Sequence, residues 1–193
     1  MFPMLVSMPF GSLPKTDMYI TPQVVLSQQQ NIEANGLFAF NQVEDQKAQN
    51  LKLQADAIDA YFAGRNSPLE GLGMKMAQEA DENGIDWRLL PAIATRESNA
   101  GLMVCKKFKF NFFGWASCHV GFDSNEEAIE VVARNLGGNN PKTAHHYDGK
   151  TTFQILQKYN PPSIVPHYAQ QVMKIMDQIG DIDLGSADKS ANA

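Results

Sequence analysis

Long apolar runs and long basic runs are both missing from this 193-residue chain. The apolar stretch near its start, MFPMLVSMPF, covers about ten residues, well short of the roughly 20 that a transmembrane helix needs. The formal net charge is −5, and the cluster KKFK (Lys106–Lys109) is too short to form a surface that neutralises phosphates. We therefore expect no integral membrane span and no nucleic-acid partner.

Cysteine is scarce, because only Cys105 and Cys118 occur. Two thiols cannot complete a four-ligand zinc site alone, and the histidines show no HExxH spacing with a glutamate. The sequence therefore predicts no metal site and no cofactor. The four histidines are His119, His145, His146 and His167.

The two cysteines flank the most aromatic segment of the chain. A disulfide between Cys105 and Cys118 would close a loop of about 14 residues and stabilise the fold by about 3 kcal/mol in the chain-entropy model. It requires an oxidising compartment. Two reduced thiols in the core are the alternative, since free cysteine is commonly buried. We favour the disulfide.

The two ends of the chain lack steady hydrophobic periodicity. We read residues 1–39 as a poorly ordered segment, whose apolar start is either the remnant of an export signal or an apolar tail. Residues 40–65 follow as one long amphipathic helix that packs on the rest, with apolar side chains at helical spacing and Gly64 at its end. Residues 66–181 form the main domain, and residues 182–193 a disordered tail.

Capping residues and glycines mark the expected starts and ends of helices in the main domain. Ser67, Pro68 and Glu70 form a capping box that predicts a helix to about residue 83. Asp86 caps the next helix, which ends at Gly101. A second capping box at 124–127 opens a helix that closes at 137–138, and further helices are expected over 152–158 and 164–179.

One segment changes period. Phe108, Phe110 and Phe112 alternate with polar residues, which is typical of a half-buried strand, and we expect these rings in the core. Gly114 then allows a turn or the close approach of a ligand. The predicted fold class is therefore α+β, mostly α, with a small β insertion.

Glu97 ends the otherwise apolar run LLPAIATRESNAG. On a helix it lies on the same face as Ile93 and Leu90, at the edge of the core. Arg96 is one step around the helix, so it pairs with Glu97 poorly. A half-buried carboxylate of this kind should have a raised pKa, and such costs concentrate at functional sites. A structural ion pair with Arg96, or a bond to a backbone amide, is the alternative.

Four runs in this order resemble the lysozyme-like superfamily, specifically its bacterial cell-wall glucosaminidase and lytic-transglycosylase branches. They are LLPAIATRESNAG, NFFGW, FDSNEEAI and YNPPSIVPHYAQQVMKIM, and the resemblance covers Ser67 to Ile179. Phe122 departs from the pattern, since the family usually has tyrosine there. The resemblance implies a helical domain with a β insertion after the helix that carries the catalytic glutamate.

The resemblance also implies cleavage of the β-1,4 bond between N-acetylglucosamine and N-acetylmuramic acid, with peptidoglycan glycan strands as the partner. Glu97 would be the general acid, because a desolvated carboxyl stays protonated near neutral pH. Such a substrate and a cysteine pair together predict an exported protein, in the periplasm, cell wall or extracellular space. The residues expected to bind substrate are Ser98, Asn111, Phe113, Gly114, Trp115, Tyr147 and Tyr159.

Sugar rings stack on aromatic side chains, and we favour Trp115 for the cleft. His145 and His146 are read as solvated loop residues, and Tyr168 as core packing. Residues 102–122 contain no acidic residue, so the β insertion supplies no second carboxylate. Asp123 is the remaining candidate.

Glu97 is therefore expected to act as the sole essential carboxylate, helped by the acetamido group or the 6-hydroxyl of the substrate. The first route gives a glucosaminidase and the second a lytic transglycosylase with 1,6-anhydromuramyl ends. Two other classes stay open. They are a noncatalytic glycan-binding protein on the same fold, and a helical adaptor that uses the long helix as an interaction arm.

Overall fold

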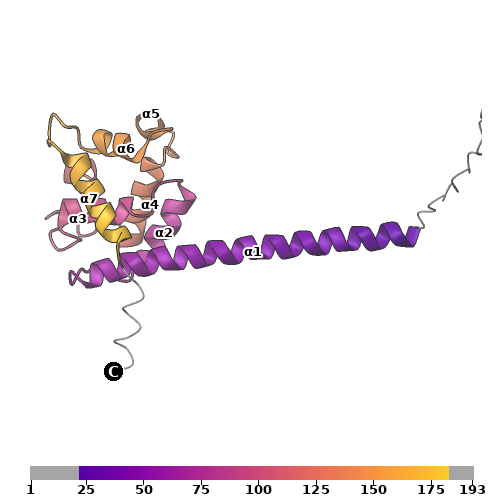
Figure 1. The fold of residues 1–193 in the computed structure, drawn as a ribbon. Coiled ribbons are helices and arrows are strands. Elements are labelled where there is room, and N and C mark those ends of the chain that lie inside the picture. The colour runs from indigo at the N-terminus through magenta and orange to yellow at the C-terminus, as the bar shows by residue number, and fades with distance from the viewer. Residues whose placement is uncertain (1–21, 183–193) are drawn as a thin grey trace, which may run out of the picture. The chain divides into compact units, whose positions relative to one another are not determined.

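The computed structural model describes residues 22–182, with side chains from residue 41 onward. The chain divides into two units, Met1–Asp45 and Gln46–Ala193, and helix α1 (Pro22–Ala63) runs across their boundary. The second unit holds the remaining elements (Figure 1). They are α2 (Gly73–Glu82), α3 (Leu89–Ser98), the 3-10 helix η1 (Trp115–Cys118), α4 (Asn125–Leu136), α5 (Ala144–Tyr147), α6 (Thr152–Tyr159) and α7 (Tyr168–Gly180). The prediction of a mostly helical protein is confirmed.

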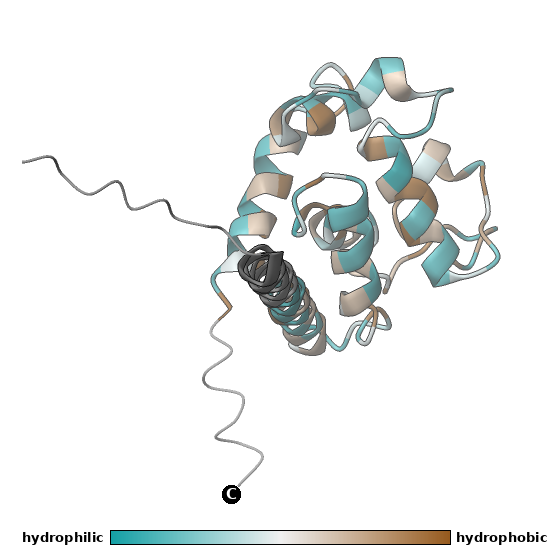
Figure 2. Cartoon of the chain, turned by 90° about the vertical axis from the view of Figure 1, so that its right-hand side faces the viewer, coloured by the Kyte–Doolittle hydropathy of each residue, from teal (hydrophilic) through white to brown (hydrophobic). Residues whose placement is uncertain are grey.

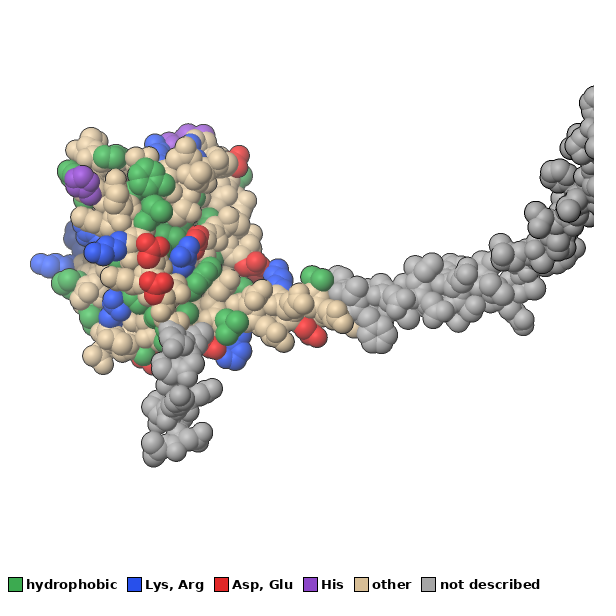
Figure 3. Space-filling view, in the orientation of Figure 1, with side chains coloured by type: hydrophobic (Ala, Val, Ile, Leu, Met, Phe, Trp, Pro, Cys, Tyr) green, Lys and Arg blue, Asp and Glu red, His purple; other side chains and the backbone are tan. Residues whose placement is uncertain are grey.

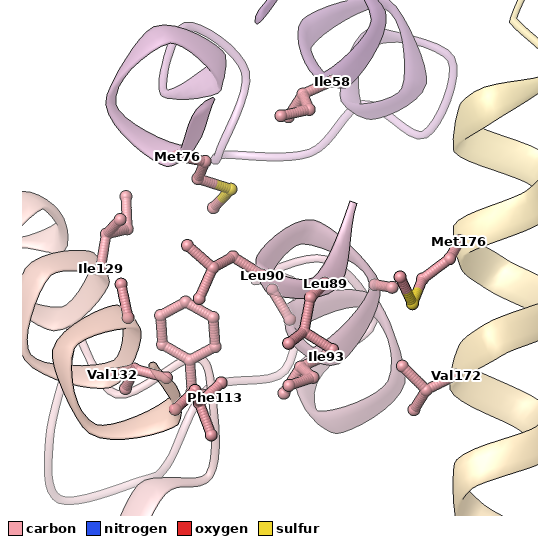
Figure 4. Packing of buried hydrophobic residues seen from close by; sticks show 14 of the residues in the cluster. Ile58, Met76, Leu89, Leu90, Ile93, Phe113, Ile129, Val132, Val172 and Met176 are labelled. Carbon is pink, nitrogen blue, oxygen red and sulfur yellow. The ribbon is translucent and has the colours of Figure 1, made fainter. Parts of the chain in front are cut away.

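Helix α3 lies at the centre of the core. Its residues from Leu89 to Ala94 are all buried, because neighbours cover it on several sides. Figure 4 shows Leu90 and Ile93 of α3 among side chains from α2, α4 and α7. The helices around it carry hydrophobic and hydrophilic residues on different faces (Figure 2), as expected for helices that bury one side. The core thus holds the last turn of α3, and with it Glu97, in a fixed place.

Helix α2 begins later than predicted and is capped from another helix. Ser67 does not cap it: its hydroxyl donates to the carbonyl of Ala100 at 2.6 Å and accepts from the amide of Leu69. The carboxylate of Asp59 instead accepts from the amides of Gly71 and Gly73, both at 2.9 Å. Free amides at a helix start need such an acceptor, and here α1 supplies it.

Two other helix starts agree with the sequence. Ser124 accepts from the amide of Glu127 at 3.1 Å at the start of α4, which is one half of the predicted capping box. The carboxylate of Glu127 accepts from the amide of Asp123 rather than from that of Ser124. Helix α6 covers the predicted residues and has a capping box of its own, formed by Thr151 and Gln154. The prediction that Asp86 caps α3 is wrong. The helix begins at Leu89 with Arg88 as its N-cap residue, and Asp86 accepts from the amide of Arg88 at 2.9 Å, one turn earlier.

The predicted β insertion is wrong, because no strand occurs within the described residues 22–182. Successive turns take its place: the amide of Phe108 donates to the carbonyl of Cys105 at 3.1 Å, and that of Asn111 to the carbonyl of Phe108 at 3.4 Å. Phe112 and Phe113 are both fully buried, so the period-two pattern does not persist. Backbone groups used in turns cannot also form a ladder with a second strand.

Helix bounds near the termini also differ from the predictions. Helix α1 begins at Pro22, inside the stretch read as poorly ordered, whereas residues 1–21 and 183–193 lie outside the described part. Helix α7 begins at Tyr168 rather than Ile164, because Pro166 disfavours helical backbone in the residue before it. The short helix α5 was not anticipated. None of the helices in residues 22–182 is long and apolar enough to span a bilayer.

Candidate active site

Glu97 lies in the last turn of α3, and the C-cap residue Asn99 has the left-handed conformation (φ 49°). The side chain is partly buried. Its Oε1 accepts a hydrogen bond of 2.6 Å from the hydroxyl of Tyr168, the first residue of α7. The neighbouring Arg96 turns away, and its Nε donates to Oε1 of Gln171 at 2.9 Å. The structure therefore does not form the alternative ion pair between Arg96 and Glu97.

Burial raises the pKa of Glu97, and this effect exceeds the opposing effects of the Tyr168 hydrogen bond and of the Arg96 charge. The raised pKa expected from the sequence is thus confirmed in direction. Burial and the negative charge of Glu97 also raise the pKa of Tyr168, which keeps its phenol protonated as a donor. A protonated carboxyl at this place can give its proton to a group in front of it.

Glycine is required where the chain passes Glu97. A Cβ at Gly114 would lie 2.9 Å from Oε2 of the glutamate, closer than real Cβ contacts allow. Gly114 also has a φ of +63°, which disfavours other residues. The sequence predicted a turn or the close approach of a ligand here. The structure shows the close approach of the Glu97 carboxylate, and contact with a ligand stays a prediction.

A left-handed turn follows Gly114. Ala116 and Ser117 have φ values of 51° and 53°, and Cys118 has a φ of 59°. This conformation costs L-residues about 1–2 kcal/mol each, so the surrounding structure must hold it in place. Two devices do so. Cys118 forms a disulfide with Cys105, with the Cα atoms 5.8 Å apart, which confirms the predicted pairing.

The side chain of Asn111 holds the same turn through hydrogen bonds. Its side-chain oxygen accepts from the amide of Trp115 at 2.8 Å. Its side-chain nitrogen donates to the carbonyls of Trp115 and Val120, at 3.0 and 2.8 Å. The side chain is almost completely buried, so we assign it to holding the loop rather than to the predicted contact with substrate.

A cleft of about 680 Å³ opens in front of Glu97. Gly114, Trp115 and Ser117 form one part of its wall, and Tyr147 and Tyr159 another. The ring of Trp115 lies 5.7 Å from that of Tyr159, which in turn stacks on Tyr168 at 6.1 Å with an interplanar angle of 10°. These three rings form a row beside the carboxyl group.

The structure divides the predicted binding residues. Gly114, Trp115, Tyr147 and Tyr159 line the cleft together with Glu97, whereas Ser98, Asn111 and Phe113 do not. Hydrogen bonds inside the fold occupy these groups. Ser98 donates to the carbonyl of Ala94 and accepts from the amide of Gly101, and the carbonyl of Phe113 accepts from the hydroxyl of Tyr159 at 2.6 Å. Phe113 is fully buried, so it stabilises the core below the cleft.

No second carboxylate lines the cleft in the described part of the chain. Asp123 is exposed and lies outside the lining, and its amide donates to the carboxylate of Glu127 at 2.5 Å. The arrangement leaves Glu97 as the acidic group of this cleft.

Sequence reasoning missed several residues of the site. Tyr168, read as packing, is buried as expected, but its hydroxyl binds Glu97. His146, read as a solvated loop residue, lines the cleft. Its pKa is lowered mainly by desolvation and, to a smaller extent, by the charge of the neighbouring His145. Thr143 and Ile164 also line the cleft. All four come from segments far along the chain from Glu97, and no local pattern marks them.

No group of three or more His, Cys, Asp or Glu side chains among the described residues is arranged to hold a metal ion. Comparison of the chain with protein-family models, with curated proteins and with solved structures finds no match.

Proposed function

We propose that this chain cleaves β-1,4 glycosidic bonds in the glycan strands of peptidoglycan, with Glu97 as the general acid. One observation carries the proposal: a partly buried carboxyl with a raised pKa faces a cleft whose wall contains tryptophan and tyrosine rings. Aromatic faces suit the apolar faces of sugar rings, and a cleft of about 680 Å³ lies in the range of ligand pockets. The resemblance of the sequence to lysozyme-like cell-wall enzymes supports the same substrate class.

The chemistry follows from a single carboxyl group. Protonated Glu97 donates its proton to the glycosidic oxygen as the bond to the anomeric carbon breaks. The acetamido oxygen of the same sugar then bonds to that carbon, and Glu97, now a carboxylate, removes a proton from the water that opens the ring so formed. In the alternative route, Glu97 removes the proton of the 6-hydroxyl, whose oxygen attacks the anomeric carbon and leaves a 1,6-anhydro end.

The surroundings of Glu97 fit both roles. Burial favours the protonated acid before bond cleavage, whereas the Tyr168 hydrogen bond stabilises the carboxylate that remains afterwards. We favour the acetamido route and thus an endo-N-acetylglucosaminidase-like enzyme. We also propose a lysozyme-like helical domain in which turns replace the β insertion, and an exported protein, which the Cys105–Cys118 disulfide supports.

Incubation of the full chain with purified peptidoglycan tests the proposal. We expect soluble muropeptides, and mass spectrometry identifies their ends. Ordinary reducing ends on N-acetylglucosamine support the favoured route, and 1,6-anhydromuramyl ends support the transglycosylase. Glu97→Gln should lower the turnover number by about 10²–10⁴-fold, the usual contribution of general acid-base catalysis.

Asp123→Asn and Glu126→Gln are the matched controls, because both remove an exposed carboxylate outside the cleft. Each should keep the turnover number of the parent chain. A loss as large as that of Glu97→Gln in either control would contradict the single-carboxyl mechanism. Binding to peptidoglycan without cleavage, at any pH tested, would instead identify a noncatalytic glycan-binding protein.

A further inference from the structure

The segment after α3 exposes apolar side chains that have no role in the cleft. Leu102, Met103 and Val104 are 51%, 68% and 36% exposed, and Val120, further along the same loop, is 42% exposed. None of the four lines the candidate active site. Three consecutive exposed apolar residues are unfavourable in water, so such a patch indicates a contact surface.

Three lysines stand directly beside these apolar residues. Lys106 and Lys107 are the central residues of the turn closed by the hydrogen bond from Phe108 to Cys105, and Lys109 lies in the next turn. All three are exposed. The ion pairs found among the described residues use other cations, namely Lys47, Lys52, Lys75 and Arg88.

The loop has the opposite charge to the chain as a whole. Residues 102–122 contain these three lysines and no acidic residue, whereas the whole chain has a net charge of −5. Figure 3 shows Lys and Arg side chains gathered at the left edge of the globular part, beside the place of α3 in Figure 1, with hydrophobic side chains next to them. The charge of this surface therefore suits an anionic partner.

The loop holds these side chains outward in a defined way. Phe108 is partly buried and packs directly against Gly121, where a Cβ would collide with its ring. The amide of Met103 donates to the carbonyl of Ser98 at 2.8 Å, which attaches the apolar end of the loop to α3. The Cys105–Cys118 disulfide ties the lysine turn to η1. The surface is thus presented on a braced loop rather than on a free end.

We propose that residues 102–109 dock the domain on the surface of an anionic lipid bilayer. Exposed aliphatic side chains beside lysines match the interfacial region of a membrane, where apolar groups enter the acyl boundary and lysines meet anionic headgroups. A soluble polyanion would bind the lysines alone and would leave the side chains of Leu102 and Met103 exposed to water. The proposal does not depend on the activity of the cleft. Because Ser117 lines the cleft and Cys118 is bonded to Cys105, docking here would bring the cleft close to the membrane.

Sedimentation of the full chain with vesicles tests the proposal. We expect binding to vesicles of phosphatidylcholine with about one third phosphatidylglycerol, little binding to phosphatidylcholine alone, and weaker binding at high salt. Replacement of Lys106, Lys107 and Lys109 by glutamine should weaken the binding by about 100-fold, at about fivefold for each lysine. The double variant Leu102→Ser/Met103→Ser should weaken it as well.

Lys142, Lys150 and Lys174 provide a matched control, because they are exposed lysines of other segments and their replacement by glutamine changes the net charge equally. This variant should bind like the parent chain. Equal loss of binding in both triple variants would overturn the proposal, and so would the absence of binding to the anionic vesicles. If serine at 102 and 103 changes nothing while a soluble polyanion competes fully, the loop binds polyanions rather than lipid.

A local measurement separates this loop from every other segment that could touch a vesicle. Amide hydrogen exchange followed by mass spectrometry should show slower exchange over residues 102–109 when anionic vesicles are added. Peptides from α4 serve as the internal control and should be unchanged. Unchanged exchange over 102–109 in protein bound to vesicles would overturn the proposal.

Discussion

The hydroxyl of Tyr168 donates to Oε1 of Glu97 at 2.6 Å, and the two residues are 71 positions apart in the chain. This contact joins the end of α3 to the start of α7 at the cleft. It also stabilises the charged form of Glu97 against the burial that raises its pKa. The protonation of the glutamate is thus set by two opposing effects, which mutations can separate.

Replacement of Tyr168 by phenylalanine should raise the pKa of Glu97 further, because the lost hydrogen bond favoured the carboxylate. The alkaline limb of the pH profile of peptidoglycan cleavage should therefore move to higher pH. The variant should also lose about 1–3 kcal/mol of stability with the hydrogen bond. A profile that keeps its limb, or moves it to lower pH, would show that this contact does not control the acid.

Glu97→Gln should make the protein more stable at neutral pH. Burial raises the pKa of Glu97, so the native state holds its proton more tightly than the unfolded chain does. The stabilisation is complete below the ordinary pKa of 4.5 and is lost as the pH rises through the higher native pKa. Melting curves should therefore place the variant a few degrees above the parent at pH 7 and close to it at pH 4. A variant that is less stable at pH 7 would contradict this sign.

Gly114→Ala should lower the activity more than the same substitution at a left-handed glycine far from the cleft. The new Cβ would press on Oε2 of Glu97, so the carboxyl group must move, and we expect activity to fall at least about tenfold. Gly84→Ala is the control, since Gly84 has a φ of +65° with no atom within 4 Å of the new Cβ. Both variants should lose about 1–2 kcal/mol from the backbone alone. Equal activity in the two would mean that the close approach has no consequence for cleavage.

Ala116→Gly should stabilise the protein by about 1 kcal/mol, because glycine adopts a φ of 51° without the strain that alanine bears. Ala60→Gly, in the regular helix α1, should have the opposite effect and cost about 1 kcal/mol. Chemical denaturation of the two variants measures both signs. Destabilisation by Ala116→Gly would show that the left-handed turn is not strained.

Reduction of the Cys105–Cys118 disulfide should loosen the turn beside Glu97 before the helices unfold. The bond closes a segment with a sequence separation of 13, and its loss should cost about 3 kcal/mol in the chain-entropy model. The Michaelis constant for peptidoglycan should rise more than the turnover number falls, since the turn lines the cleft and does not carry the acid. Alkylation before and after reduction checks that the bond is present, and two free thiols in protein made under oxidising conditions would contradict it.

The features that sequence reasoning predicted well are those fixed by neighbours in the chain. Burial of α3 and the position of Glu97 at its end follow from one apolar run, and Ser124 caps α4 from three residues away. The cysteine pair was predictable because two thiols allow only one pairing within the chain. Each of these signals is contained in a short stretch of sequence.

The features that it missed depend on contacts between distant segments. Alternating phenylalanines predicted a strand, but a strand also needs a partner, and the backbone here forms turns instead. Asn111 and Ser98 are polar residues in a family-like motif, yet their hydrogen bonds are made inside the fold. Tyr168 looks like a core residue because it is one, and only the folded chain shows where its hydroxyl points.

Asp59 makes the C-terminal part of α1 necessary in any shortened form of this protein. Its carboxylate serves the free amides at the start of α2, and the residues of α1 from Gln46 onward belong to the same unit as the cleft. A chain cut at Ser67, where the family resemblance starts, would therefore lose the acceptor for Gly71 and Gly73 and the apolar cover that Ile58 and Phe62 provide. A shortened chain should therefore begin inside α1, not at the loop that follows it.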